Sequence, residues 1–166
     1  HRETSYSPAA FEVSYRFITG KAPAAIAIAP EAQVVLNGKV TGLGVDPLDP
    51  KTGNFSNNLP VPGARVEIFA TDPATGERRG AALHSKTVGA DGLWGPARVP
   101  TAAPVEMVVS AAGYATTHIY RSGFPRSSDI IHLRAERIAD ADKDAKALVT
   151  FVRPRGYFDP PRDQMS

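Results

Sequence analysis

The side chains with the clearest potential for metal chemistry are three histidines, His84, His118 and His132. None of them stands close to another in the sequence, so a zinc site would need facing strands to bring them together. A histidine on a strand more often lies exposed or hydrogen-bonded within the fold than on a metal. The chain has no cysteine, which removes thiolate nucleophiles, disulfides and cysteine-type zinc sites. We therefore expect no metal and no cofactor.

Acidic side chains offer an alternative site for a hard cation. Asp140, Asp142 and Asp144 have the spacing of the first three ligands of an EF-hand loop. Ala145 stands where that loop needs glycine, and Phe151 stands where it needs a bidentate glutamate. Further oxygen donors lie in an insertion at residues 43–60, namely Asp46, Asp49, Asn54, Asn57 and Asn58. The Asp, Asn, Gly and Pro content of this insertion favours a solvated polar loop over a calcium site.

No serine nucleophile can be identified in the chain. The motif Gly-x-Ser-x-Gly, which places a serine on a sharp strand-to-helix turn, does not occur. Ser5, Ser7 and Ser14 border or lie within one expected helix, so none of them can occupy such a turn. If the chain serves an esterase, the serine and the acid of that enzyme must come from another segment.

The first element that could position such groups is a helix expected over residues 8–19. Ser7 is a suitable N-cap, Pro8 suits the first helical position, and Gly20 supplies a stop. Large apolar side chains, among them Phe11 and Ile18, recur on one face at helical spacing. A single helix cannot bury such a stripe alone, so we expect it to dock on another element.

From Val34 onward the hydrophobic period changes to two, which is the pattern of half-buried strands. Seven short strands are expected, one starting near residue 34 and the others at residues 64–70, 83–88, 105–111, 116–120, 130–134 and 148–152. Turns rich in Gly, Pro and Asp separate them. The pattern predicts a mainly β fold, a seven-stranded antiparallel β-sandwich, rather than a parallel sheet with crossover helices.

Four runs within this stretch follow one another in a characteristic order: LNGKVTG at 36–42, VPGARVEI at 61–68, KTVGADGLW at 86–94 and VSAAGY at 109–114. Together they resemble the carboxypeptidase-regulatory, transthyretin-like family, in which a strand, a Pro-Gly-Ala turn, an Asp-Gly hairpin and a late Gly-Tyr succeed each other. The resemblance implies a transthyretin-like sandwich. Asp91 and Gly92 are expected to form its tight hairpin, because such a turn requires positive φ.

The opening of the chain, HRETSYSPAA followed by FEVSYRFITG, resembles the end of an α/β-hydrolase catalytic domain, where a final helix follows the triad histidine. The resemblance implies that His1 is the general base that takes the serine proton and returns it to the leaving group. A histidine at the start of a chain can instead remain from an affinity tag. The two resemblances and the strand pattern together divide the chain into four parts. These are a hydrolase end at 1–22, a linker at 23–32, the sandwich at 33–152 and an irregular strap at 153–166.

Charge and hydropathy restrict the partners. The chain has 19 basic and 17 acidic residues, and the resulting formal net charge of +2 gives no indication of a nucleic-acid partner. Its longest apolar stretch, residues 24–29, is far shorter than the roughly 20 residues of a membrane span. We expect a secreted or periplasmic bacterial protein without a nucleic-acid partner and without a membrane span.

Aromatic side chains could bind an ester or polymer substrate, because flat rings stack on sugars or lie on hydrophobic polyester. The candidates are Phe69, Trp94, Tyr114, Tyr120, Phe124 and Tyr157. Trp94 and Tyr114 are expected in the core or in turn packing. Phe69 and Phe124 are the preferred substrate-binding residues, Phe69 because it alternates outward with its charged neighbours on the strand.

Two functions follow as hypotheses. In the first, the chain is the C-terminal portion of a secreted serine carboxylic-ester hydrolase, a lipase or esterase, and its partner is the upstream catalytic segment. In the alternative, it is a stand-alone, non-catalytic module that binds a polymer or a cell-surface partner. A Lys-Asn crosslink of the pilin type is not expected, because the final strands offer no asparagine for Lys39. Oligomerisation through an edge strand is physically reasonable, but no residue argues for it specifically.

Overall fold

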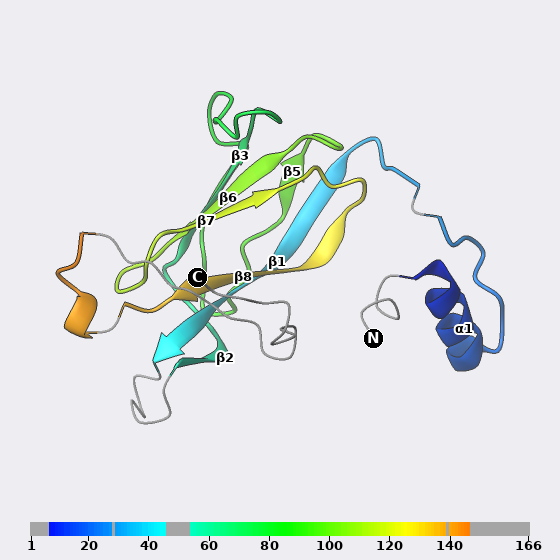
Figure 1. Ribbon diagram of the computed structural model, residues 1–166, viewed down its shortest axis with the longest axis horizontal. Coiled ribbons are helices and arrows are strands. Elements are labelled where there is room, and N and C mark those ends of the chain that lie inside the picture. The colour runs from blue at the N-terminus through cyan, green and yellow to red at the C-terminus, as the bar shows by residue number, and fades with distance from the viewer. Residues whose placement is uncertain (1–6, 28, 46–53, 139, 147–166) are drawn as a thin grey trace, which may run out of the picture.

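The computed structural model describes residues 7–27, 29–45, 54–138 and 140–146, and its main body consists of two four-stranded sheets (Figure 1). The first sheet has the order β2-β1-β5, with β8 also paired to β1, and the second has the order β4-β3-β6-β7. The strands are β1 (Val34–Val45), β2 (Asn54–Pro60), β3 (Arg65–Ala70), β4 (His84–Thr87), β5 (Ala97–Val99), β6 (Val105–Ser110), β7 (Thr117–Arg121) and β8 (Ser128–Glu136). The expectation of a mainly β fold is confirmed.

The core lies between the sheets because alternate side chains of each strand point inward. On β3, Val66 and Ile68 are fully buried, whereas Arg65, the first residue of the strand, is exposed. The same alternation on β1 buries Leu36 and Val40. Trp94 is completely buried among them, as expected from the sequence, and Tyr114 packs against this core while partly exposed.

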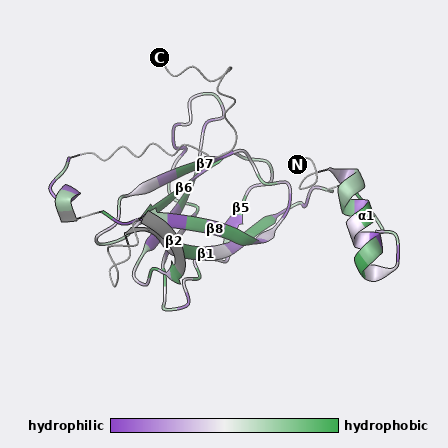
Figure 2. Ribbon diagram, turned by 60° about the horizontal axis from the view of Figure 1, so that its bottom comes forward, coloured by the Kyte–Doolittle hydropathy of each residue, from purple (hydrophilic) through white to green (hydrophobic). Residues whose placement is uncertain are grey.

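The N-terminal helix α1 (Pro8–Thr19) forms where the capping signals predict it. The Ser7 hydroxyl accepts a hydrogen bond from the Ala10 N–H, and Gly20 ends the helix in the left-handed conformation with φ +70°. No residue of α1 is buried, and Phe17 and Ile18 are 90% and 79% exposed. Figures 1 and 2 show the helix, with its apolar positions, standing apart from the two sheets. The helix therefore presents an apolar face that nothing in the described chain covers.

The number and direction of the strands differ from the sequence-based expectation. Eight strands are present in the described residues rather than seven, and the expected final strand at 148–152 lies outside them. The expected loop at 43–60 contains β2, which pairs antiparallel with the second half of β1. The sandwich is also not wholly antiparallel, because β8 runs parallel to β1. Parallel neighbours need a long crossover connection, and here the whole second sheet lies between β1 and β8 in the sequence.

The turn at Asp91 and Gly92 is tight but does not close a hairpin. The Gly92 N–H donates to the Gly89 carbonyl over 3.1 Å, and Gly92 has φ +77°, as the Asp-Gly pair predicts. The strand before this turn, β4, pairs with β3, whereas Leu93 after the turn bridges Lys39 on β1. The turn therefore carries the chain from one sheet to the other, and the expectation of a hairpin is wrong.

Among the described residues, no helix is long and apolar enough to cross a membrane.

Candidate functional site

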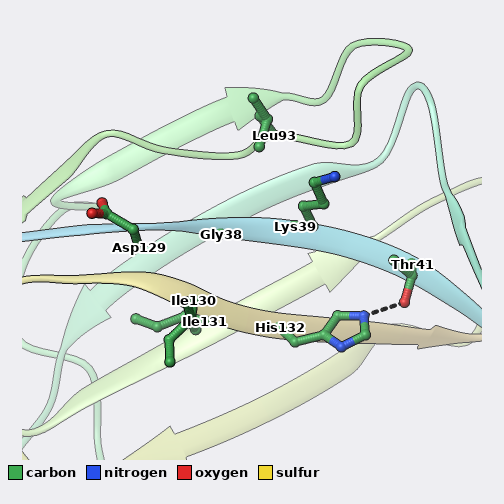
Figure 3. Close-up of a pocket in the computed structure, with 8 residues that line it drawn as sticks. All are labelled: Gly38, Lys39, Thr41, Leu93, Asp129, Ile130, Ile131 and His132. Carbon is green, nitrogen blue, oxygen red and sulfur yellow. Dashed lines mark hydrogen bonds between the residues drawn. The ribbon is translucent and has the colours of Figure 1, made fainter. Parts of the chain in front are cut away.

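A pocket of about 510 Å³ opens on the outer face of the first sheet, where β1 and β8 run side by side (Figure 3). We call it the bulge pocket. Its lining comes from three segments: Gly38, Lys39 and Thr41 on β1, Leu93 after the Asp91 turn, and Asp129, Ile130, Ile131 and His132 on β8. The volume lies within the range of small-molecule sites.

A β-bulge in β8 creates this pocket. Leu36 pairs with Ser128 and Gly38 pairs with Ile131, so three steps along β8 match two steps along β1. Such an extra residue breaks the regular alternation and re-aims the side chains beside it. Asp129 and Ile130 are both exposed as a result, and Ile130 is 89% exposed. The bulge thus places a carboxylate and a large apolar side chain at the rim of one pocket.

Gly38 is the residue that allows β8 to approach at the bulge. A Cβ atom built on Gly38 would lie 1.7 Å from the carbonyl oxygen of Ile131, which is far inside van der Waals contact. The same oxygen accepts a hydrogen bond of 3.3 Å from the indole Nε1 of Trp94. The Ile131 carbonyl therefore faces the buried side of the sheet, and a glycine on β1 is required beneath it.

The polar side chains of the pocket differ in how far they are satisfied. Asn37 donates from Nδ2 to Oδ1 of Asp129 over 2.8 Å. The Nε2 atom of His132 is hydrogen-bonded to the Thr41 hydroxyl. Lys39 is exposed and has neither an ion pair nor a side-chain hydrogen bond within the part of the chain that the structure describes. Its ammonium group is thus the one described charge on the pocket wall without a partner.

The apolar wall of the pocket is held in place by the turn before it. The Leu93 N–H donates to Oδ1 of Asp91 over 2.9 Å, and Leu93 then bridges Lys39 in antiparallel pairing. Leu93 is 41% exposed, although a leucine gains free energy from burial. The pocket accordingly combines an unpaired cation with unburied apolar surface.

A group of charged and polar side chains lies on the outer face of the other sheet, around Glu106 of β6. The Glu106 side chain is only 2% exposed, and its Oε2 and Oε1 accept hydrogen bonds from Nε of Arg78 over 2.5 Å and from Nδ1 of His118 over 2.7 Å. The Arg78 hydrogen bond is the main reason why the pKa of Glu106 falls to about 2, against the opposing effect of burial. Because this carboxylate is ionised and can only accept, His118 must carry its proton on Nδ1.

Tyr120 completes the Glu106 group on β7. Its position is directly opposite Glu106 in the β6–β7 pairing, and the two side chains are hydrogen-bonded. That hydrogen bond to an anion is the largest cause of the raised pKa of the Tyr120 phenol. Tyr120 is nevertheless 60% exposed. The group is therefore a satisfied ionic network that stabilises the outer face of this sheet.

The structure places the two aromatic residues proposed for substrate binding in different settings. Phe69 lies on the outer face of β3 as expected, and the Arg78 guanidinium stacks over its ring at 4.0 Å from the centroid. Phe124 is partly buried and packs against the core. The structure does not bring the two rings into one described pocket with each other. Their role in substrate binding stays a prediction.

The histidines do not form a cluster. His84 donates from Nε2 to the Trp94 carbonyl over 2.8 Å, while His118 and His132 bind Glu106 and Thr41 on different sheets. No group of three or more potential metal-ligating side chains occurs in the described ranges. His1, the predicted general base, lies outside the described residues, as do Asp46 and Asp49 of the expected polar loop.

The bulge pocket was not foreseen from the sequence. Sequence patterns do not bring Lys39 and Asp129 together, because their proximity depends on the register of two strands some 90 residues apart in the chain. One local signal was available: a glycine inside a strand pattern, as at Gly38, indicates a bulge or a close backbone approach. That signal indicates a close approach at Gly38, but it locates neither the pocket nor its other lining residues.

Comparison with known proteins gives one family match and several distant structural likenesses. A family model described as the lipase C-terminal domain matches residues 32–138. No match is found among curated proteins.

The solved structures with similarity include catechol 1,2-dioxygenases. That from Acinetobacter sp. ADP1 is 15% identical with a TM-score of 0.40, over 91% of this chain and 74% of the other. That from Acinetobacter radioresistens is 11% identical with a TM-score of 0.42, over 78% and 65%. A minor pilin of Streptococcus agalactiae is 12% identical with a TM-score of 0.33, over 76% and 50%. Likenesses of this size carry no argument about activity.

Proposed function

Because this chain belongs to the family of lipase C-terminal domains, we propose that it is the C-terminal portion of a secreted serine carboxylic-ester hydrolase. The observation that supports the proposal is the family match at residues 32–138, which spans all eight described strands. A C-terminal domain of this kind accompanies a catalytic part of a lipase. In the proposal that catalytic part precedes the sandwich and supplies the serine and the acid that this chain lacks.

The exposed face of α1 supports a catalytic partner on the N-terminal side. Phe11, Phe17 and Ile18 are 48%, 90% and 79% exposed, and a helix in isolation gains little from such side chains. In the proposal α1 is the last helix of the catalytic domain and packs there. His1 then acts as the general base of the triad, taking the serine proton and delivering it to the leaving alcohol.

The sandwich has an accessory role in this proposal, in substrate binding or in stability. Phe69 and Phe124 keep part of their rings outside the core, and we propose that they contact the ester or polymer. The main body needs no help from α1 to bury Trp94 and the other core residues, since none of its core members comes from the helix. An accessory domain of this kind can form independently of the catalytic part.

The test uses the whole protein that contains this sequence, assayed on a short-chain and a long-chain chromogenic ester. His1→Ala is expected to abolish turnover of both esters, whereas the neighbouring Arg2→Ala is expected to leave turnover unchanged. Phe69→Ala is expected to raise KM for the long ester more than for the short one, because ring contact is lost without change to the triad. Full turnover in the His1→Ala protein would refute the triad role of His1. Absence of ester turnover in the unaltered protein would contradict the proposed function and would make a stand-alone binding module the working account.

A further inference from the structure

The bulge pocket offers two kinds of recognition side by side. Lys39 contributes an ammonium group without a partner among the described residues, and Leu93 and Ile130 contribute apolar surface that is 41% and 89% exposed. A site that joins one unpaired cation to an apolar wall is complementary to a molecule with an anionic head and a hydrocarbon tail. We propose that the bulge pocket binds an amphiphilic carboxylate, such as a medium-chain fatty acid.

The carboxylate head belongs at Lys39. The pairing of β1 with β8 places His132 directly beside Lys39, and the His132 ring is anchored through Nε2 to the Thr41 hydroxyl. Figure 3 shows Lys39 and Asp129 at separate places along the wall, and no ion pair joins them. The Asp129 carboxylate is instead held by Asn37. Within the described part of the chain, no carboxylate pairs with Lys39, so its ammonium group can pair with an external anion.

The hydrocarbon tail belongs against Leu93 and Ile130. The bulge forces Ile130 outward, where water surrounds it almost completely, and the turn at Asp91 presents Leu93 from the opposite side of β1. A flexible alkyl chain that lies on these side chains removes apolar surface from water on both partners. Neither side chain has to move from the core for this contact, so the site is already formed in the free protein.

This binding goes beyond the proposed function and does not depend on it. The chain alone has no serine nucleophile of the required motif, so binding is measured without turnover. Where the proposed function also holds, the bound acid is the class of molecule that ester hydrolysis releases. Failure of one proposal therefore leaves the other to be judged on its own measurement.

The experiment titrates octanoate into the 166-residue chain and follows backbone amide resonances by NMR. The uncharged 1-octanol and the cationic octylammonium are titrated in parallel. Octanoate is expected to shift the amides of residues 38–41 and 129–132, and to bind more tightly than either comparison compound. Exposed α1 could also attract alkyl chains, so shifts confined to residues 8–19 count against the pocket.

Three variants separate the contributions of the wall. Lys39→Met is expected to weaken octanoate binding about fivefold, which is the upper range for an exposed ion pair. Lys21→Met removes the same charge beyond α1 and is expected to have no effect. Asp129→Asn is expected to tighten octanoate binding, because it removes from the pocket wall a negative charge that repels the octanoate carboxylate. Lys39 and Asp129 are both exposed, so neither change threatens folding.

Several results would overturn the proposal. The proposal fails if octanoate causes no amide shifts at concentrations up to tens of millimolar. It also fails if Lys39→Met and Lys21→Met lose octanoate affinity equally, because the pocket then does not recognise the carboxylate through Lys39. Tighter binding of octylammonium than of octanoate would assign the site to cations recognised by Asp129. A weakening by Ile130→Ser, with octanol less affected than octanoate by Lys39→Met, would support the assignment of tail and head.

Discussion

The indole Nε1 of Trp94 donates a hydrogen bond of 3.3 Å to the backbone carbonyl of Ile131, at the point where β8 bulges over Gly38. This contact joins the centre of the hydrophobic core to the strand that forms the pocket. Trp94 is fully buried, so its N–H has no access to water and needs this acceptor. The core and the bulge pocket are therefore coupled through one buried polar contact.

Replacing Trp94 by Phe tests this coupling. The change leaves the Ile131 carbonyl without its indole donor and also removes buried ring volume. We expect the free energy of unfolding to fall by about 2–4 kcal/mol, from the unpaired carbonyl and from the cavity together. Urea unfolding monitored by circular dichroism measures this loss. A loss below about 0.5 kcal/mol would show that neither the contact nor the ring packing matters to the fold.

Gly38 offers a test of the bulge itself. In Gly38→Ala the new Cβ would lie 1.7 Å from the Ile131 oxygen, so β8 must move away from β1. We expect a loss of about 3 kcal/mol or more in thermal or urea unfolding, at the upper end for overpacking. Gly89→Ala is the matched control, because its Cβ would meet only the Asp91 carboxylate at 3.5 Å. Equal stability of the two variants would contradict the close approach.

The Glu106 group makes stability depend on pH in the acid range. Its folded-state pKa of about 2, held down first by the Arg78 hydrogen bond, lies below the ordinary value of 4.5. A lowered carboxyl pKa contributes stability that is fully present above pH 4.5 and is lost as the pH falls toward 2. The loss is about 1–3 kcal/mol, because Arg78 and His118 remain about half exposed to solvent. Asp72, whose pKa is lowered to about 2 by Arg79, titrates over the same range.

Comparison of Glu106→Gln with Glu67→Gln isolates the buried carboxylate from the surface ones. Glu106→Gln is expected to lower the free energy of unfolding at pH 7 and to flatten its decline between pH 5 and about pH 2. Glu67 pairs with Arg65 on the surface, so Glu67→Gln is expected to change stability by less than about 0.5 kcal/mol. An unchanged pH slope in Glu106→Gln would assign the acid sensitivity elsewhere.

The exposed face of α1 predicts different behaviour in the isolated chain and in a larger hydrolase. Phe17→Ser removes an apolar side chain that is 90% exposed here, so the sandwich of the 166-residue chain should unfold at the same urea concentration. In the larger protein the same change should lower stability by about 2–4 kcal/mol, as for other buried large-to-small changes. Equal, negligible effects in both proteins would mean that the catalytic part does not cover α1.

Local signals in the sequence were enough for the helix and for the inner strands. Ser7, Pro8 and Gly20 act on their immediate neighbours, and α1 begins and ends accordingly. Buried and more exposed side chains alternate on β3 as predicted, because one face of the strand contacts the core and the other contacts charged groups. Such features depend on residues close in sequence, and the predictions for them are confirmed.

The sequence-based predictions failed for features that depend on the pairing of strands distant in the sequence. β5 has only three residues between Pro96 and Pro100, which is too short for a period of two to show. β2 is a polar segment that becomes a strand because β1 extends far enough to pair with it. The parallel direction of β8 and its bulge over Gly38 arise from the packing of the whole chain. The pocket is built from these nonlocal features, so sequence patterns could not locate it.

The most direct test of the central claim is to label the native source protein with a serine-directed fluorophosphonate and to determine the intact mass of the species that contains this sequence. The account predicts a labelled polypeptide larger than 17.6 kDa, in which this sequence is the C-terminal portion and the labelled serine precedes His1. A native species of 17.6 kDa that takes up no label, with no labelled companion, would contradict the account.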